Sequence, residues 1–152
     1  MGANCSVTNS VELFDTDFIS EYIRDKPDAV ARFRSTPRER RFTTIVSEAE
    51  IIGARYRQLL TAANEIEMMA AQMFLNVARD VFANSFAGVL ETEMVSSRLY
   101  VELKQVKKLA KVDNADLIIA SIALRHSATP VTGTVEHFRK VPRLKVEDFR
   151  RR

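Results

Sequence analysis

Short strand-like segments alternate with helical patterns along this chain, and that alternation is the feature that most constrains its fold. The strand-like segments, apolar and mostly β-branched or aromatic, are residues 11–14, 42–46, 86–90, 129–132 and 144–146. Strands that alternate with helices usually pair in parallel and carry helices on both faces of the sheet. The sequence therefore predicts an α/β fold, a three-layer α/β/α sandwich with a mainly parallel central sheet of about five strands.

The helical patterns fill the intervals between these segments. Their expected bounds are residues 17–24, 28–35, 47–62, 66–81, 92–108 and 113–126. Within 66–81, Ile66, Met69, Met73 and Val77 recur at three- or four-residue spacing, which indicates an amphipathic helix. We expect this apolar face to pack in the core, with its methionines as filler.

Length and composition fit one soluble domain. The chain has 152 residues, of which 46% are hydrophobic and 28% charged, and it shows no repeat and no linker. We expect a flexible leader at 1–9, one domain at 10–149 and a basic tail at 150–152. The single Cys5 has no disulfide partner and fits a reducing compartment. No apolar run has the roughly 20 residues of a membrane helix, and no secretory signal is apparent. The predicted location is the cytoplasm, without a membrane.

Basic residues form several clusters in a chain of net charge +3. The simplest interpretation is that each cluster is a solvated helix face. A basic rim around an acidic centre would instead suit a nucleic-acid substrate. The clusters are Arg38, Arg40 and Arg41; Arg55 and Arg57; Lys104, Lys107, Lys108 and Lys111; and residues 150–152.

Three acidic residues occupy comparable places in this alternation. Asp15 follows the first strand-like segment, where no helix cap is obviously needed. Glu50 follows the second, and Asp116 starts an apolar helical run. Carboxylates where a strand ends or a helix begins can converge on one edge of an α/β sheet, where ligands usually bind. Converging carboxylates repel one another unless a cation joins them, so a divalent-metal site is the first hypothesis.

Helix capping is the structural alternative for these acids. Glu50 lies three residues after Ser47, which as an N-cap would form a capping box with it. Asp116 has the same relation to Asp113, and Asp17 is a candidate N-cap for the first helix. Independent caps need not converge, whereas a metal site requires convergence. The combination therefore favours the metal site.

Oxygen ligands alone suit Mg²⁺ or Mn²⁺, which usually keep several waters and meet phosphate oxygens. Such an ion lowers the pKa of bound water and neutralises charge in the transition state of phosphodiester hydrolysis. The sequence offers no Gly-rich phosphate loop and no Ser-His or Cys-His pair. Its two histidines, His126 and His137, have no nucleophile nearby in sequence and are expected at the surface or core edge.

The ordered motifs resemble those of PIN-domain ribonucleases, in particular VapC-type toxins of type II toxin–antitoxin systems. The resemblance runs from about residue 11 to 149, although residues 60–92 match only in helical character. It implies an endoribonuclease that depends on Mg²⁺ or Mn²⁺, is inhibited by a cognate antitoxin protein and forms a homodimer. The motifs that carry it are residues 13–21, 44–54, 113–124, 130–134, 137–138 and 141–149.

By motif position, the resemblance implies that Asp15, Glu50 and Asp116 are the catalytic metal ligands, with Thr16 as a supporting hydroxyl. The chain departs from the family pattern at Thr134, where an Asp or Asn is usual. A neutral hydroxyl is a poorer ligand, so a second ion should bind more weakly. Asp17 replaces the usual Asn. Compensation for Thr134 by Asp17 or by Glu136 remains open.

Two other functions compete with the ribonuclease. Asp15-Thr16-Asp17 after an apolar strand also resembles the nucleophile motif of haloacid-dehalogenase-type phosphohydrolases. That family has Thr or Val where this chain has Ile19, and its later Gly-Asp motif has no good equivalent here. The non-enzyme alternative is a PIN-like module that binds RNA or an antitoxin with weak or no catalysis, for which Thr134 is the main support.

Overall fold

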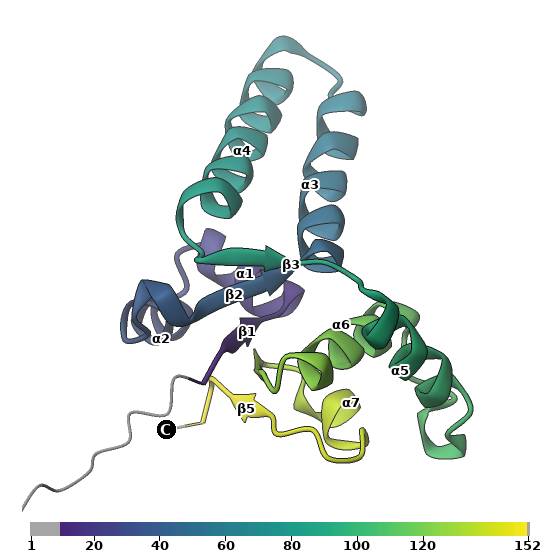
Figure 1. The fold of residues 1–152 in the computed structure, drawn as a ribbon. Coiled ribbons are helices and arrows are strands. Elements are labelled where there is room, and N and C mark those ends of the chain that lie inside the picture. Colours follow the sequence, from purple (N-terminus) through teal and green to yellow (C-terminus); the bar gives the residue numbers. More distant parts are fainter. Residues whose placement is uncertain (1–9, 152) are drawn as a thin grey trace, which may run out of the picture.

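Five short parallel strands form the centre of the structure, a computed structural model that describes residues 10–151 (Figure 1). The predictions for the leader at 1–9, including Cys5, and for Arg152 lie outside these residues. The strand order is β3-β2-β1-β4-β5, with β1 in the middle and every neighbouring pair parallel. The strands are β1 (Glu12–Phe14), β2 (Arg41–Thr44), β3 (Gly88–Leu90), β4 (Thr129–Thr132) and β5 (Glu147–Asp148).

Helices cover both faces of this sheet, which confirms the predicted three-layer α/β sandwich. In Figure 1, α3 and α4 form a long hairpin that extends beyond the sheet, and α5, α6 and α7 gather on the other side. The helices are α1 (Thr16–Ile23), α2 (Pro27–Arg34), α3 (Ile45–Leu60), α4 (Glu65–Asn84), α5 (Met94–Lys104), α6 (Asn114–Arg125) and α7 (Val135–Arg139), with 3₁₀ turns η1 (Arg38–Arg40) and η2 (Lys107–Leu109).

The two cores follow from the two-residue period of the central strand. Leu13 and Phe14 are both fully buried, but they belong to different hydrophobic clusters because successive strand residues face opposite sides of the sheet. Phe14 joins an aromatic core with Phe18 and Phe33, at ring-centroid distances of 4.6 and 5.1 Å. Leu13 packs with the aliphatic α5–α7 layer. Burial on both faces fixes the sheet that positions the acids.

The prediction for the last strand is wrong by three residues. Residues 144–146 lie outside the sheet, and β5 is formed by Glu147 and Asp148, which pair with Val131 and Thr132 of β4. Leu144 and Val146 pack instead against the aliphatic core. Their apolar character therefore reflects side-chain burial, whereas backbone pairing with β4 decides where the strand forms.

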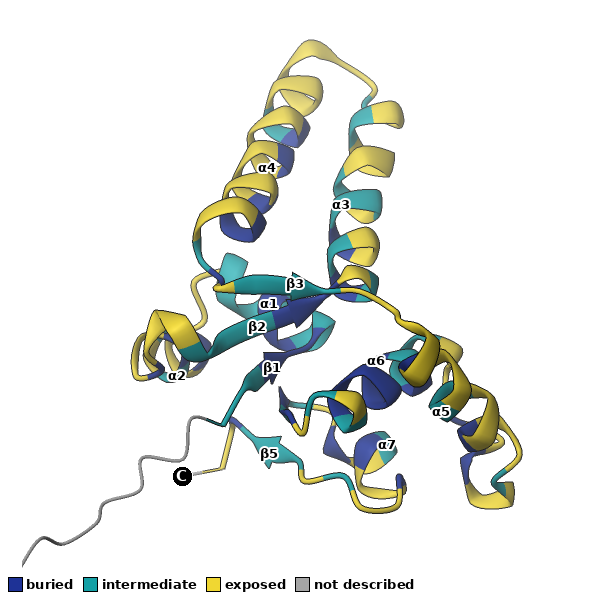
Figure 2. Ribbon diagram, viewed as in Figure 1, coloured by how far each residue is buried: buried dark blue, intermediate teal, exposed yellow. Residues whose placement is uncertain are grey.

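The prediction that the apolar face of 66–81 fills the core is also wrong. Ile66, Met69, Met73, Phe74 and Val77, here called the α4 stripe, are 45–81% exposed. The buried face of α4 is the neighbouring one, formed by Ala71, Leu75, Ala78, Val81 and Phe82. Figure 2 shows the outer side of α4 as exposed along the hairpin. The helix itself is as predicted, but the face that packs against the rest of the chain contains no methionine.

Among residues 10–151, no helix is both long and apolar enough to cross a membrane.

Candidate functional site

Asp15 lies at the carboxyl end of the central strand β1, with only 4% of its surface exposed. Contrary to the expectation that no cap is needed there, it is the N-cap of α1. Its Oδ1 accepts a hydrogen bond from the Phe18 backbone N–H at 2.9 Å. Asp17, the residue expected to cap this helix, lies within its first turn instead. Strand and helix adjoin directly, so one residue both ends β1 and caps α1.

The surroundings of Asp15 disfavour its ionised form. Burial, together with the negative charges of Asp17 and Asp116, raises the pKa of Asp15 to about 7. Hydrogen bonds from the Thr132 side chain and the Phe18 backbone act in the opposite direction. Such a carboxyl would be stabilised as an anion by a cation placed beside it.

Glu50 reaches the same region from α3. The predicted capping box is wrong, because α3 begins at Ile45 with Thr44 as its N-cap, whose side chain accepts from the Ser47 N–H. Glu50 is therefore in the second turn, and its Oε1 accepts from Thr16 Oγ1 at 3.0 Å. Burial first, and then the charges of Asp116 and Asp113, raise the pKa of Glu50. Its carboxylate faces the other acids, not the helix end.

Asp116 comes from the first turn of α6. Asp113 is the N-cap, as the sequence suggested, and accepts from the Ala115 N–H at 2.8 Å. Asp116 instead contacts His137, whose Nδ1 lies 2.7 Å from Asp116 Oδ2. Sequence reasoning assigned His137 no such role, since its helix α7 is five residues long and lies 21 positions away. The contact orients the Asp116 carboxylate.

Asp17 is held by Gly133 and Arg150, two residues from the last part of the chain. Its Oδ2 accepts from the Gly133 N–H at 3.1 Å and lies 3.5 Å from the Arg150 guanidinium. Arg150 also pairs with Glu21 and donates to the Gly133 carbonyl at 3.3 Å. A Cβ on Gly133 would lie 2.6 Å from Asp17 Oδ2 and would displace that side chain. Arg150, expected only as part of a basic tail, thus forms an ion pair with the additional acid.

Thr134 follows Gly133 in the chain but does not add a further ligand to the acids. It precedes α7, and its backbone N–H donates to Thr132 Oγ1 at 2.9 Å, while its own side chain makes no capping hydrogen bond. Thr134 and Glu136 are both exposed. Among residues 10–151, neither forms a hydrogen bond or an ion pair with Asp15, Glu50 or Asp116.

The predicted ligands form a coupled set rather than a finished metal cage. Within residues 10–151, no ion pair joins Asp15, Glu50 or Asp116 to Lys or Arg, and no three His, Cys, Asp or Glu side chains already form a group that could hold a metal ion. The Glu50 carboxylate is hydrogen-bonded to Thr16, and the Asp116 carboxylate is hydrogen-bonded to His137. The donor set still fits Mg²⁺ or Mn²⁺ in chemistry, because it is all oxygen and the negative charge of Asp116 raises the pKa of both Asp15 and Glu50.

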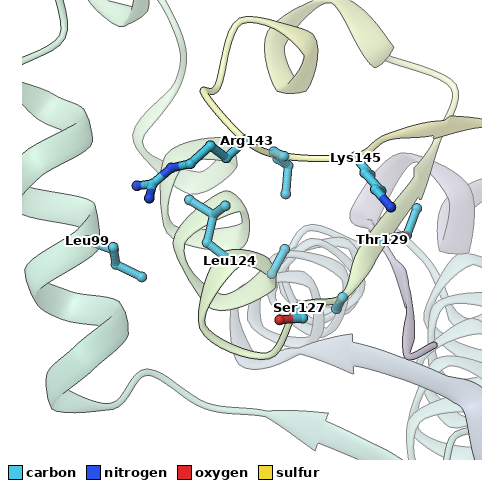
Figure 3. A pocket seen from close by; sticks show the side chains of 9 residues that line it. Leu99, Leu124, Ser127, Thr129, Arg143 and Lys145 are labelled. Atoms are coloured by element: carbon cyan, nitrogen blue, oxygen red, sulfur yellow. The ribbon is translucent and has the colours of Figure 1, made fainter. Parts of the chain in front are cut away.

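A separate cavity of about 440 Å³ opens near the start of β4, away from the carboxyl ends of the strands. Figure 3 shows Leu99, Leu124, Arg143 and Lys145 around it. None of the acids predicted from the sequence lines this cavity. The acidic edge is therefore the candidate functional site.

No protein-family model and no curated protein matches the chain. Solved structures do match it. FitAcB from Neisseria gonorrhoeae is 23% identical, with 91% of this chain and 98% of that chain covered and a TM-score of 0.71. VapBC2 from Rickettsia felis, bound to a promoter DNA fragment, is 18% identical, with 90% and 97% covered and a TM-score of 0.67. VapBC-5 from Mycobacterium tuberculosis, of the VapBC family of toxin–antitoxin systems, is 21% identical, with 91% and 96% covered and a TM-score of 0.56.

These matches span nearly the whole chain on both sides of each comparison. At such low identity they concern the fold alone, which is the three-layer α/β sandwich predicted from the sequence.

Proposed function

We propose that this chain is the toxin of a toxin–antitoxin pair and acts as a metal-dependent endoribonuclease. One observation carries the proposal. Asp15, Glu50 and Asp116, from three separate elements, interact at the carboxyl edge of the central strands, and no internal Lys or Arg among residues 10–151 pairs with them. The shared fold with structures of toxin–antitoxin systems supports the biological role.

In this proposal Asp15, Glu50 and Asp116 hold Mg²⁺ or Mn²⁺. The ion would supply a water of low pKa and neutralise charge on the phosphodiester in the transition state. Thr16 positions the Glu50 carboxylate, and His137 positions that of Asp116. Asp17 is left out of the ligand set because Arg150 and the Gly133 N–H already bind its carboxylate.

The protein partners are proposed from the α4 stripe. A row of five large apolar side chains is unusual on the surface of a solitary chain and indicates an interaction site. We assign it to protein contacts, either between two copies in a homodimer or with a cognate antitoxin. Solved relatives of the same fold include a toxin–antitoxin complex from Klebsiella pneumoniae, which supports a protein partner.

The test is cleavage of RNA by the purified protein with and without Mg²⁺ or Mn²⁺. We expect cleavage only with the ion and its loss, by about 100-fold or more, in Asp15→Ala and in Asp116→Ala. Glu102→Ala, an exposed acid on α5, is the matched control and should cleave like the unaltered protein. Undiminished cleavage by both site variants would sink the assignment of these acids.

A module that binds RNA or antitoxin with little catalysis is the second candidate. Thr134 at the expected fourth polar position favours this candidate. So does the hydrogen bond that Glu50 accepts from Thr16. Metal binding without any RNA cleavage would decide for this candidate. The phosphohydrolase alternative gains no support, because the proposed nucleophile Asp15 is buried and already caps α1.

A further inference from the structure

A groove of about 570 Å³ runs from the acidic edge along α1 and α3. Thr16 and Glu50, both part of the candidate site, lie among its lining residues. Three arginines also line it, namely Arg24 at the end of α1 and Arg55 and Arg57 on α3. The groove thus joins the acids to a row of cations.

These three arginines differ from the arginines that hold the fold together. Arg32, Arg40 and Arg150 each form ion pairs with acids. Within residues 10–151, no carboxylate pairs with Arg24, Arg55 or Arg57. Their charges are therefore available to an external anion.

The geometry of α3 points this cationic row toward the acids. Glu50 and Arg57 are seven residues apart, two turns along one face, which corresponds to about 10 Å of helix. A Cβ on Gly53 would lie 3.5 Å from the Arg57 guanidinium, so that side chain folds back along α3 toward Glu50. Arg55 is held by Phe74, at 5.4 Å from the ring centroid, and by Gln58.

Apolar side chains lie among the polar residues that line the groove. Ile23 and Ile51 line it together with Ala49 and Ala54. A polyanion with apolar faces, such as the bases and riboses of a nucleic-acid strand, matches this combination better than a purely acidic segment does.

We propose that the α1–α3 groove is the path of a single RNA strand, with Arg24, Arg55 and Arg57 bound to its phosphates and the acidic edge at one end. This inference rests on the proposed ribonuclease function, and it names the surface that delivers the substrate. It places the strand across α1 and α3, and away from the α5–α7 layer.

The experiment measures binding of a labelled single-stranded RNA 20-mer in EDTA, so that cleavage plays no part. Each phosphate contact contributes about 0.7 to the slope of log K against log salt concentration for single strands. We expect the triple variant R24Q/R55Q/R57Q to lower the magnitude of that slope by about 2 and to weaken binding about tenfold or more at low salt. R24K/R55K/R57K should keep most of the slope.

The matched control is R34Q/R79Q/R98Q. It removes the same charge from three exposed arginines outside the groove. An equal fall in slope for the two triple variants would overturn the groove, since net charge alone would then explain it. An equal loss of binding to poly-glutamate would overturn the assignment to RNA in favour of an acidic protein segment. Loss of RNA cleavage with intact binding in EDTA would instead concern the proposed chemistry.

Discussion

Two carboxylate clusters lie at opposite ends of β1, and they differ in the source of their counter-charge. At its beginning, Glu12 lies 2.8 Å from Arg32 and 3.5 Å from Arg40, and Arg32 also pairs with Glu147 of β5 at 2.7 Å. At its end, Asp15 interacts with other acids, and no Lys or Arg among residues 10–151 pairs with it.

The pKa values record this difference. Burial opposes ionisation at both ends. At Glu12 the hydrogen bonds and charge of Arg32, with Thr36 and Arg40, outweigh burial and lower the pKa. At Asp15 burial prevails and raises the pKa to about 7. A cluster that contains its own cations is complete as a structural brace, whereas one without them is open to an ion from solution.

The largest effect is expected from breaking the brace. Arg32→Met leaves the largely buried Glu12 without its main partner and should lower the free energy of unfolding by about 3–5 kcal/mol. Urea denaturation at pH 7 measures it. Arg34→Met, an exposed position on the same helix, should change stability by no more than about 0.5 kcal/mol. A loss below about 1 kcal/mol for Arg32→Met would mean that the two clusters are not different in kind.

The next effect concerns Asp15 and pH. Its pKa is about 7 in the folded chain against an ordinary 3.8, so the folded state keeps a proton that the unfolded state loses. Stability should therefore fall as pH rises from about 4 to 7 and then level off. Asp15→Asn removes this loss and keeps a good N-cap. In EDTA, its gain over the unaltered protein should be larger at pH 8 than at pH 4 by on the order of 2–4 kcal/mol.

Thermal or urea unfolding of both proteins across this pH range provides the measurement. A difference between them that stays constant from pH 4 to pH 8 would contradict an unneutralised carboxyl at Asp15, and with it the contrast to Glu12.

The smallest effect concerns the contact between His137 and Asp116. His137→Ala should cost about 1 kcal/mol of stability, because it removes one hydrogen bond at a half-exposed site. It should also weaken Mn²⁺ binding about tenfold, because Asp116 loses the group that orients it. Calorimetric titration with Mn²⁺ measures the second effect. The control is His126→Ala, which changes a histidine outside the group of Asp15, Glu50 and Asp116 and should leave Mn²⁺ binding unchanged. Equal weakening in both variants would remove His137 from the site.

Local signals predicted much of the fold and part of the site. The apolar run before Asp15, the cap at Asp113 and the first-turn position of Asp116 all depend on neighbours within four residues. The start of α3 was predicted at Ser47, but Thr44 is also a good N-cap. Pairing of Thr44 with Leu90 of β3 ends the strand at Thr44 and starts the helix there. Glu50 therefore lies in the second turn of α3, where it does not act as a cap.

The sequence alone determined the alternation of strands and helices and the placement of three acids at one edge of the sheet, because period and order along the chain suffice for both. Only the tertiary structure decided which acids are neutralised. Arg32 is 115 residues from Glu147, and Arg150 is 129 residues from Glu21. Coulomb interactions depend on distance in space and on burial, and folding sets both. Packing decided the burial of α4 in the same way, because its predicted core face is exposed and a neighbouring face contacts the rest of the chain.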